Sequence, residues 1–314
     1  MTPAEAAVST EDVLTAADVA AAAQLACLLE ASAPKPGNVC PGRHFADLRY
    51  EDFLAGAVAI AAPMAQAGTR PLGQTIRLAV EATARWTQSN ANLGIVLLLA
   101  PLAKAATARL RGSDPHTRGD SRLRDELRRV LAQTTVDDAR EVYAAIRLAS
   151  PGGLGKAESQ DVADEPTTTL LGAMELAAGR DGIAREYASA YETTFMVGAP
   201  TLERARSDGL AWDDAVVETF LTLLAAGPDT HIARRGGEHI AADVSRRAAA
   251  VLRAGGVRAD EGRRGIDDMD RALRGEGHIA NPGTTADLTA AAIFVVLLDG
   301  GWRATPGGTD AGAQ

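Results

Sequence analysis

The stretch Leu93-Gly94-Ile95-Val96-Leu97-Leu98-Leu99-Ala100-Pro101-Leu102-Ala103-Lys104-Ala105-Ala106 sets the fold class that we expect for this chain. A helix through these residues is apolar on most of its faces, which is typical of a helix that is buried on all sides. The preceding Ser89-Asn90-Ala91-Asn92 supplies residues that cap helices well, and Pro101 is expected to kink the helix. The segment therefore predicts a central, buried helix.

Helical periodicity continues on both sides of this segment, and alternating strand patterns are nearly absent. We expect an all-α fold, a single multi-helix bundle domain of roughly a dozen helices over residues 1–300, with a disordered tail at 301–314. The first helix is capped at 10–12 and ends at Ser32. The other expected helices are 50–64, 71–86, 122–132, 136–149, 166–178, 182–197, 213–226, 230–253, 266–273 and 284–298, with loops at 111–120 and 255–264.

Composition excludes several classes of protein. The net charge is −9, from 32 Lys and Arg against 41 Asp and Glu, which argues against a general nucleic-acid binder. Two cysteines, Cys27 and Cys40, form neither a disulfide framework nor a zinc cluster. Residues 1–10 lack the pattern of a signal peptide, and no apolar run is long enough to span a bilayer. We expect a cytoplasmic protein without a membrane or nucleic-acid partner.

The first informative break in the helical pattern is Pro34-Lys35-Pro36-Gly37-Asn38. Two prolines and a glycine favour a stiff, non-helical turn that holds Lys35 in one place. His44 and Asp47 follow shortly after it. A cation, an imidazole and carboxylates beside one rigid turn suit a site for a phosphorylated substrate with a metal. The alternative is an interhelical loop with a solvated lysine.

A second candidate lies around Asp229 and His231. If a helix starts here, Asp229 lies near its N-terminus, and His231 shares a face with Arg235 at i,i+4 beside Arg234. An aspartate with two arginines suits a triphosphate together with a metal. The alternative is an N-cap with surface salt bridges.

Two further breaks contain glycine. The run at 151–155 precedes Asp161, and it is not a P-loop because it lacks the Lys-Ser/Thr ending and a preceding strand. The second, Asn281-Pro282-Gly283-Thr284-Thr285-Ala286-Asp287, reads as a helix N-terminus whose free amides can bind anions. A capped core helix is the better interpretation for Thr284, while the role of Asp287 stays open.

Taken together, these breaks resemble the triphosphoribosyl-dephospho-CoA synthase family. The resembling residues occur in the family's order between residues 30 and 298, and the Asn38-Val39 and Asn92-Leu93-Gly94-Ile95 variants look more like a divergent branch found in archaea and methylotrophs. They are Pro34-Lys35-Pro36-Gly37, His44 with Asp47, Ser89-Asn90-x-Asn92-x-Gly94, Pro151-Gly152-Gly153, Asp161, Asp229-Thr230 with Arg234, and Pro282-Gly283-x-x-Ala286-Asp287.

The resemblance implies an all-helical transferase that joins the ribose C1′ of ATP to the 2′-hydroxyl of 3′-dephospho-CoA and releases adenine. Carboxylates would stabilise the oxocarbenium character at C1′, and Mg²⁺ with local cations would hold the triphosphate. The general base is left open between His44 and a carboxylate. The implied roles are catalysis for His44, Asp47 and Asp161, metal binding for Asp47, Asp161 and Asp229, and substrate or phosphate binding for Lys35, Asn38, Asn90, Asn92, Arg234 and Arg235.

Two other functions remain open at this stage. The acceptor could be a precursor of a one-carbon carrier such as a methanopterin, because the 89–94 segment lacks a His and a Lys that the citrate-lyase-associated members carry. Alternatively, the chain could be a helical nucleotide-binding protein without turnover. In each case the expected partners are small molecules, and a homodimer is left open. Measuring adenine release from ATP with each acceptor distinguishes the three functions.

Overall fold

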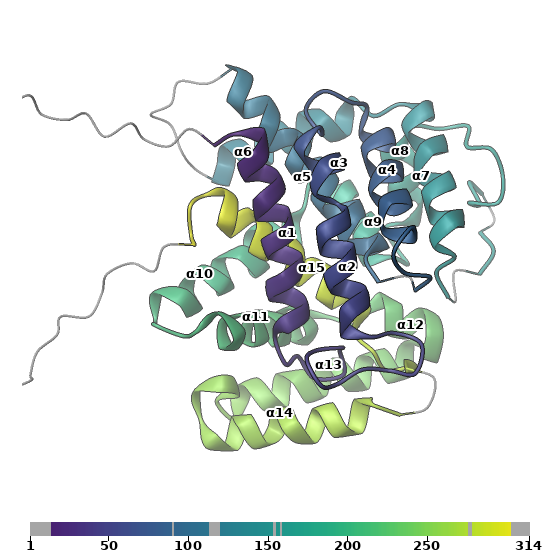
Figure 1. Ribbon diagram of the computed structural model, residues 1–314. Helices are drawn as coiled ribbons and strands as arrows, with labels where there is room; N and C mark the ends of the chain where they lie inside the picture. Colours follow the sequence, from purple (N-terminus) through teal and green to yellow (C-terminus); the bar gives the residue numbers. More distant parts are fainter. Residues whose placement is uncertain are drawn as a thin grey trace, which may run out of the picture.

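The computed structural model describes residues 14–89, 91–112, 120–152, 155–157, 159–275 and 278–302, and all regular structure in this part of the chain is helical, as the sequence predicted (Figure 1). The helices are α1 (Ala16–Ser32), α2 (Tyr50–Ala59), α3 (Ala61–Ala65), α4 (Leu72–Ala84), α5 (Leu93–Gly112), α6 (Asp120–Ala132), α7 (Val136–Ala149), α8 (Leu170–Ala177), α9 (Gly182–Ser189), the π-helix η1 (Thr194–Gly198), α10 (Ala199–Ser207), α11 (Trp212–Ala226), α12 (Thr230–Gly236), α13 (Glu238–Arg253), the 3₁₀-helix η2 (Gly256–Arg258), α14 (Asp260–Leu273) and α15 (Gly283–Leu298).

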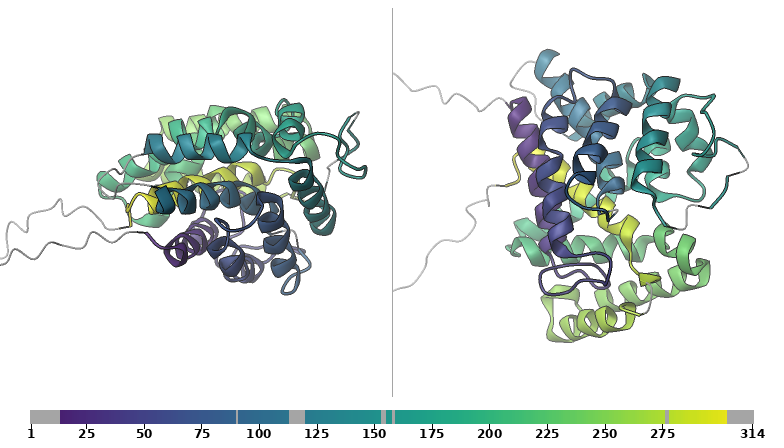
Figure 2. Two further views of the ribbon diagram at one scale, coloured as in Figure 1. Left: turned by 90° about the horizontal axis from the view of Figure 1, so that it is seen from above. Right: turned by 45° about the vertical axis from the view of Figure 1, so that its right-hand side comes forward.

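Helix α15 runs through the middle of the molecule, between the purple and blue helices of the N-terminal part and the green helices (Figure 2). It packs against α1, α5, α10 and α11. All residues from Thr289 to Leu298 of α15 are buried, as are residues 95–103 of α5. The segment that the sequence predicts at the centre, in α5, is therefore in the core together with α15.

Helix α5 continues through Pro101 because tyrosines from α9 and the turn after it supply the missing hydrogen bonds. Proline has no N–H, so the carbonyl of Leu97, four residues earlier, loses its helical partner. The hydroxyl of Tyr187 donates to that carbonyl oxygen at 2.7 Å, and the hydroxyl of Tyr191 donates to the oxygen of Leu98 at 3.0 Å. Both tyrosines are fully buried. They satisfy a carbonyl that would otherwise be an unpaired polar group in the core.

Several predicted boundaries are wrong, and left-handed backbone explains two of them. The predicted helix 182–197 is interrupted where Ala190 and Tyr191 take φ values of 51° and 59°. The predicted helix 230–253 is split into α12 and α13 at Gly237, whose φ is 93°. Helix 166–178 starts later than Pro166, because Thr169 caps α8 by accepting a hydrogen bond from the N–H of Gly172. Helix α10 was not predicted.

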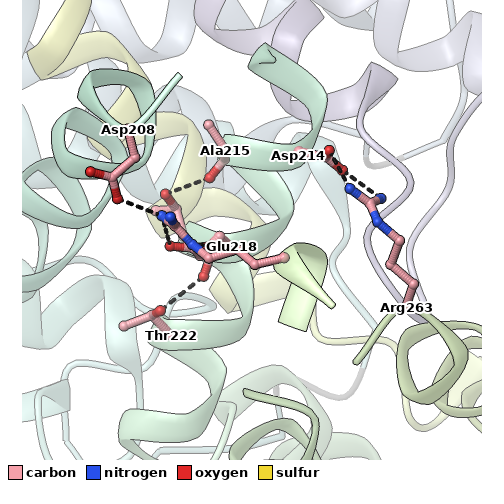
Figure 3. A network of polar contacts seen from close by, with 8 residues as sticks. Asp208, Asp214, Ala215, Glu218, Thr222 and Arg263 are labelled. Atoms are coloured by element: carbon pink, nitrogen blue, oxygen red, sulfur yellow. Dashed lines mark hydrogen bonds and ion pairs between the residues drawn. The ribbon is translucent and has the colours of Figure 1, made fainter. Parts of the chain in front are cut away.

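The predicted loop 255–264 is largely helical, because its arginines are used in ion pairs with α11. Arg258 donates two hydrogen bonds of 2.8 Å to the carboxylate of Glu218. Arg263 reaches both carboxylate oxygens of Asp214, at 3.0 and 2.6 Å (Figure 3). These paired contacts hold η2 and the first turns of α14 against α11, in a stretch whose composition alone suggests a solvated loop.

The structure describes part of the predicted C-terminal tail, whereas the predicted N-terminal cap lies outside the described residues. Gly301 and Trp302 fall in the predicted tail but are held in place: the N–H of Gly301 donates to the oxygen of Val296, and Trp302 stacks on Trp212 with ring centroids 5.4 Å apart. Residues 303–314 and the predicted cap at 10–12 lie outside the described residues, and α1 is capped by Thr15 instead. Within the described part, no helix is long and apolar enough to cross a membrane.

Candidate active site

Three helix N-termini meet at one place, and Asp229 and Thr230 join them. Asp229 caps α12 by accepting from the N–H of Ile232 at 3.0 Å, and its other oxygen accepts from both the N–H and the hydroxyl of Thr285 in α15, each at 2.7 Å. The hydroxyl of Thr230 accepts from the N–H of Gly182, the first residue of α9, at 2.9 Å. The positive ends of three helix dipoles therefore face one region, which favours an anion there.

Two cavities meet at this region. The larger, of about 720 Å³, has a polar wall that includes Glu30, Asn38, Asp47, Asn92, Arg235 and Asn281. The smaller, of about 360 Å³, has an apolar wall with Leu97, Val142, Ile146, Met174 and Ile183, and Tyr143 beside them. They share Leu93, Gly94, His231 and Asp287. We call these four residues the junction.

Asp287, in the second turn of α15, places its carboxylate directly on the backbone of α5. A methyl group on Gly94 would lie 2.0 Å from Asp287 Oδ2, so glycine is needed for the carboxylate to stand there. Among the described residues, no hydrogen bond or ion pair satisfies this carboxylate. Burial raises the pKa of Asp287 well above its usual range, and the negative charges of Glu30 and Asp229 raise it further. Such a carboxylate is suited to accept a proton.

Lys35 does not line either cavity, which corrects its predicted role as a phosphate ligand. The side chain is buried, with Nζ 3.0 Å from Glu30 Oε1, and it donates to the main-chain oxygens of Glu30 and Ala33. The rigid turn itself is present, because Gly37 has a φ of 79° and donates its N–H to Asp270. The lysine thus fixes Glu30 in the wall of the larger cavity and leaves no donor for a phosphate.

His231 belongs to the junction and is held on both sides. Its Nδ1 lies 3.3 Å from Nη2 of Arg234, which also donates from Nη1 to Asp181 at 3.2 Å. The ring packs on Gly283, where an added methyl group would lie 3.2 Å from Cγ of His231. Burial lowers the pKa of His231 to about 4, with the charges of Arg234 and Arg235 acting in the same direction. The imidazole is therefore neutral at neutral pH.

The three predicted metal ligands do not form one cluster. Both oxygens of Asp161 accept from main-chain N–H groups, those of Ala157 and Ala163, and both oxygens of Asp229 are used in the helix caps. Within the described residues, no group of three or more His, Cys, Asp or Glu side chains is arranged to hold a metal ion. Asp161 and Asp229 shape the chain locally, which is the capping alternative.

The other predicted residues are distributed around the cavities. Asp47 lines the larger cavity and lies 2.6 Å from Nε2 of His278, whereas His44 is exposed and lines neither cavity. Asn38, Asn92 and Arg235 line the larger cavity, and Arg234 and Asp161 the smaller one. Asn90 lies outside the described residues. Four of the six residues predicted to bind substrate thus line a cavity, and their roles stay a prediction.

Sequence reasoning did not assign Glu30 or Asp287. Each is an acidic residue in a mainly apolar helix, Glu30 near the C-terminus of α1 and Asp287 near the N-terminus of α15. Glu30 is only 2% exposed. A carboxylate on the apolar side of a core helix must be paired or functional. That rule would have found both residues.

The chain matches known proteins over most of its length. A family model described as ATP:dephospho-CoA triphosphoribosyl transferase matches residues 16–306. A crystal structure from Archaeoglobus fulgidus, titled as a triphosphoribosyl-dephospho-CoA synthase, has a TM-score of 0.61 at 28% identity and covers 80% of this chain and 100% of that one.

Curated relatives match over a shorter segment. A probable 2-(5''-triphosphoribosyl)-3'-dephosphocoenzyme-A synthase of Pseudomonas paraeruginosa is 36% identical over 108 residues, 33% of this chain and 36% of that protein. A protein of the same name from Pseudomonas putida is 35% identical over 116 residues, 36% of this chain and 40% of the relative. The matched segment thus spans well under two thirds of either relative.

Proposed function

Because the chain belongs to the ATP:dephospho-CoA triphosphoribosyl transferase family, we propose that it joins the ribose C1′ of ATP to the 2′-hydroxyl of 3′-dephospho-CoA and releases adenine. The observation that carries the proposal is the junction, where an unpaired carboxylate, Asp287, lies between two cavities. A transfer between two substrates needs both of them to reach one carbon atom. Two cavities that share a short wall meet that requirement.

Asp287 is the residue that we assign to the acceptor. Its carboxylate takes the proton of the 2′-hydroxyl while that oxygen attacks C1′, and the electrons of the C1′–N9 bond leave with adenine. The raised pKa of Asp287 brings its basicity closer to neutral pH, where a general base works best. The negative charges of Asp287 and Glu30 also favour the positive character that develops at C1′.

The larger cavity suits the phosphates of ATP. Its wall contains Arg235 and side-chain amides, and the N-termini of α12 and α15 lie beside it. Arg235 and the side-chain amides supply cationic and N–H donors, which a triphosphate needs in a chain of net negative charge. The apolar wall of the smaller cavity suits a flat base instead.

Mg²⁺ would enter with ATP. Magnesium is usually held by one or two carboxylates together with substrate phosphates, so a full protein cage is not required. Asp47 is the predicted metal ligand that lines the larger cavity with an exposed carboxylate, and it fits this role. The proposal also implies a cytoplasmic location, where ATP is available. A homodimer stays a prediction, which light scattering can test.

The test is adenine release from ATP in the presence of Mg²⁺, followed by chromatography with 3′-dephospho-CoA, a pterin precursor or no acceptor. We expect adenine with 3′-dephospho-CoA, and a loss of about 10²–10⁴-fold in Asp287→Asn, as for a missing general base. Asp213→Asn, an exposed position on α11, is the matched control. Adenine release with only the pterin precursor would change the acceptor, and ATP binding without any release would reduce the chain to a binding protein.

A further inference from the structure

The hydrogen-bonding state of His231 follows from its neighbour. A guanidinium group has donors only, so the contact between Arg234 Nη2 and His231 Nδ1 makes Nδ1 the acceptor. The single hydrogen of the neutral ring is then on Nε2. This atom is buried, and it has no hydrogen-bond partner among the described residues. A buried donor without a partner is rare in a native protein and indicates an acceptor that arrives with a ligand.

The position of His231 ties that ligand to the reacting carbon. The ring packs on Gly283, and Asp287 lies one helical turn further along the same face of α15. His231 and Asp287 each line both cavities. A ribose whose C1′ is within reach of an acceptor held by Asp287 therefore also brings its adenine close to His231.

We propose that His231 is a catalytic residue that donates a hydrogen bond from Nε2 to a ring nitrogen of the departing adenine. This rests on the proposed function, since it assigns the leaving group of that reaction. When the C1′–N9 bond breaks, its electron pair goes to the purine and spreads over N3 and N7. The N–H of His231 stabilises that charge. The proton that Asp287 takes from the hydroxyl balances the one that adenine gains from water.

The chemistry of the donor favours the base over a phosphate. The pKa of His231 is about 4, because of burial first and then the charges of Arg234 and Arg235, so the ring brings no positive charge to the site. A phosphate is better bound by charged donors, and Arg235 already provides one in the larger cavity. A neutral N–H next to an apolar wall suits a purine nitrogen.

The test compares ATP with 3-deaza-ATP and 7-deaza-ATP, each of which lacks one ring acceptor, in the wild type, His231→Ala and His231→Gln. We expect the wild type to use one of the analogues about 10²-fold less well than ATP in kcat, the usual effect of one transition-state donor. His231→Ala should be slower with ATP by a similar factor, and its preference for ATP over that analogue should fall to within about threefold. His231→Gln, whose amide can place an N–H near the same point, should keep part of the preference.

His239→Ala, an exposed histidine on α13, is the control and should behave as the wild type.

Two outcomes would overturn the assignment. Equal use of ATP and both analogues by the wild type would mean that no ring nitrogen is contacted. An unchanged preference in His231→Ala would mean that another group makes the contact. Calorimetry with free adenine tests the contact between His231 and adenine separately from the proposed function. Weaker adenine binding by His231→Ala than by the wild type supports the contact even if the wild type releases no adenine from ATP. Equal adenine binding by the two proteins rules the contact out.

Discussion

At the residue scale, the charged carboxylate of Asp287 should lower the free energy of unfolding. A half-buried carboxylate without a partner is costly when charged, and its raised pKa expresses that cost. Because the pKa is raised in the folded state, proton binding by Asp287 stabilises the fold. This contribution to the free energy of unfolding is complete below the unfolded-state pKa of about 3.9 and is lost as the pH rises through the folded-state pKa. Asparagine removes the charge and keeps the shape.

We therefore expect Asp287→Asn to melt a few degrees higher than the wild type at pH 8, although it is inactive. The difference should disappear at about pH 3, below the unfolded-state pKa, where aspartate is protonated in both states. Thermal denaturation at both pH values measures it. A lower melting temperature for Asp287→Asn at pH 8 would show that the carboxylate is paired and not free.

The side chain of Asp287 also depends on one glycine. A methyl group at residue 94 would come within 2.0 Å of Oδ2, so Gly94→Ala must move either the carboxylate or α5. We expect kcat to fall by at least about tenfold, since misplacement by about 1 Å can cost 10²-fold. The helix itself should remain, because alanine is a better helix former than glycine. Circular dichroism and turnover should be measured together.

Gly179→Ala is the matched control for that substitution, because a methyl group there meets nothing within 4 Å. If Gly94→Ala is as active as Gly179→Ala, the carboxylate has room to move and its position at the junction does not matter.

Residue types alone predicted the region of the site better than the roles within it. The motifs around 35, 47, 161 and 229 do lie at or near the cavities. A lysine in a rigid turn reads as a phosphate ligand, but the fold turns it inward onto Glu30. Asp229 reads equally as a metal ligand or a cap, and only the position of Thr285, 56 residues later, shows that both its oxygens are used.

At the element scale, the pairing of α5 with Tyr187 is open to a direct test. Tyr187→Phe leaves the carbonyl of Leu97 with only the hydroxyl of Tyr191, 3.5 Å away, which should cost about 1–3 kcal/mol of the free energy of unfolding. Pro101→Ala restores an N–H four residues after Leu97. In that background, we expect the cost of Tyr187→Phe to be much smaller. Urea denaturation of the four proteins gives the coupling energy.

An equal cost of Tyr187→Phe in both backgrounds would contradict this account, because it would mean that the hydroxyl does not replace the hydrogen bond that proline removes. The sequence could predict that Pro101 lies in the helix, but not its partner. Residues 97 and 187 are 90 positions apart, and no local pattern joins them.

The periodicity of apolar residues predicted which segments are helical. Several helix ends, however, depend on contacts between residues that are distant in sequence. Helix α7 was predicted with its observed ends, and in the structure Thr135 and Asp138 form a capping box at its start. Helix α14 begins at Asp260 in a stretch that reads as a loop, because Arg263 is bound to Asp214 of α11. The break at Ala190 and Tyr191 could not be predicted, because neither left-handed residue is a glycine.

At the scale of the whole molecule, the fold makes one site out of breaks that are far apart in the chain. The start of α5, the starts of α9, α12 and α15, and the turn after α1 all reach the two cavities or the residues that shape them. Sequence analysis found most of these breaks through their Pro, Gly and Asn content. It could not find the junction, because Gly94 and Asp287 meet only when α5 and α15 pack in the core.

The proposed function requires that the triphosphoribosyl group of ATP passes whole to an acceptor at the junction. Mass spectrometry of the product formed from ATP with a ¹³C-labelled ribose and 3′-dephospho-CoA tests it most directly. We expect one product that contains the labelled ribose, all three phosphates of ATP and the intact acceptor, formed in equal amount with free adenine and about 10²–10⁴-fold more slowly with Asp287→Asn. Labelled ADP as the only new species, or a product that carries phosphate without labelled ribose, would contradict it.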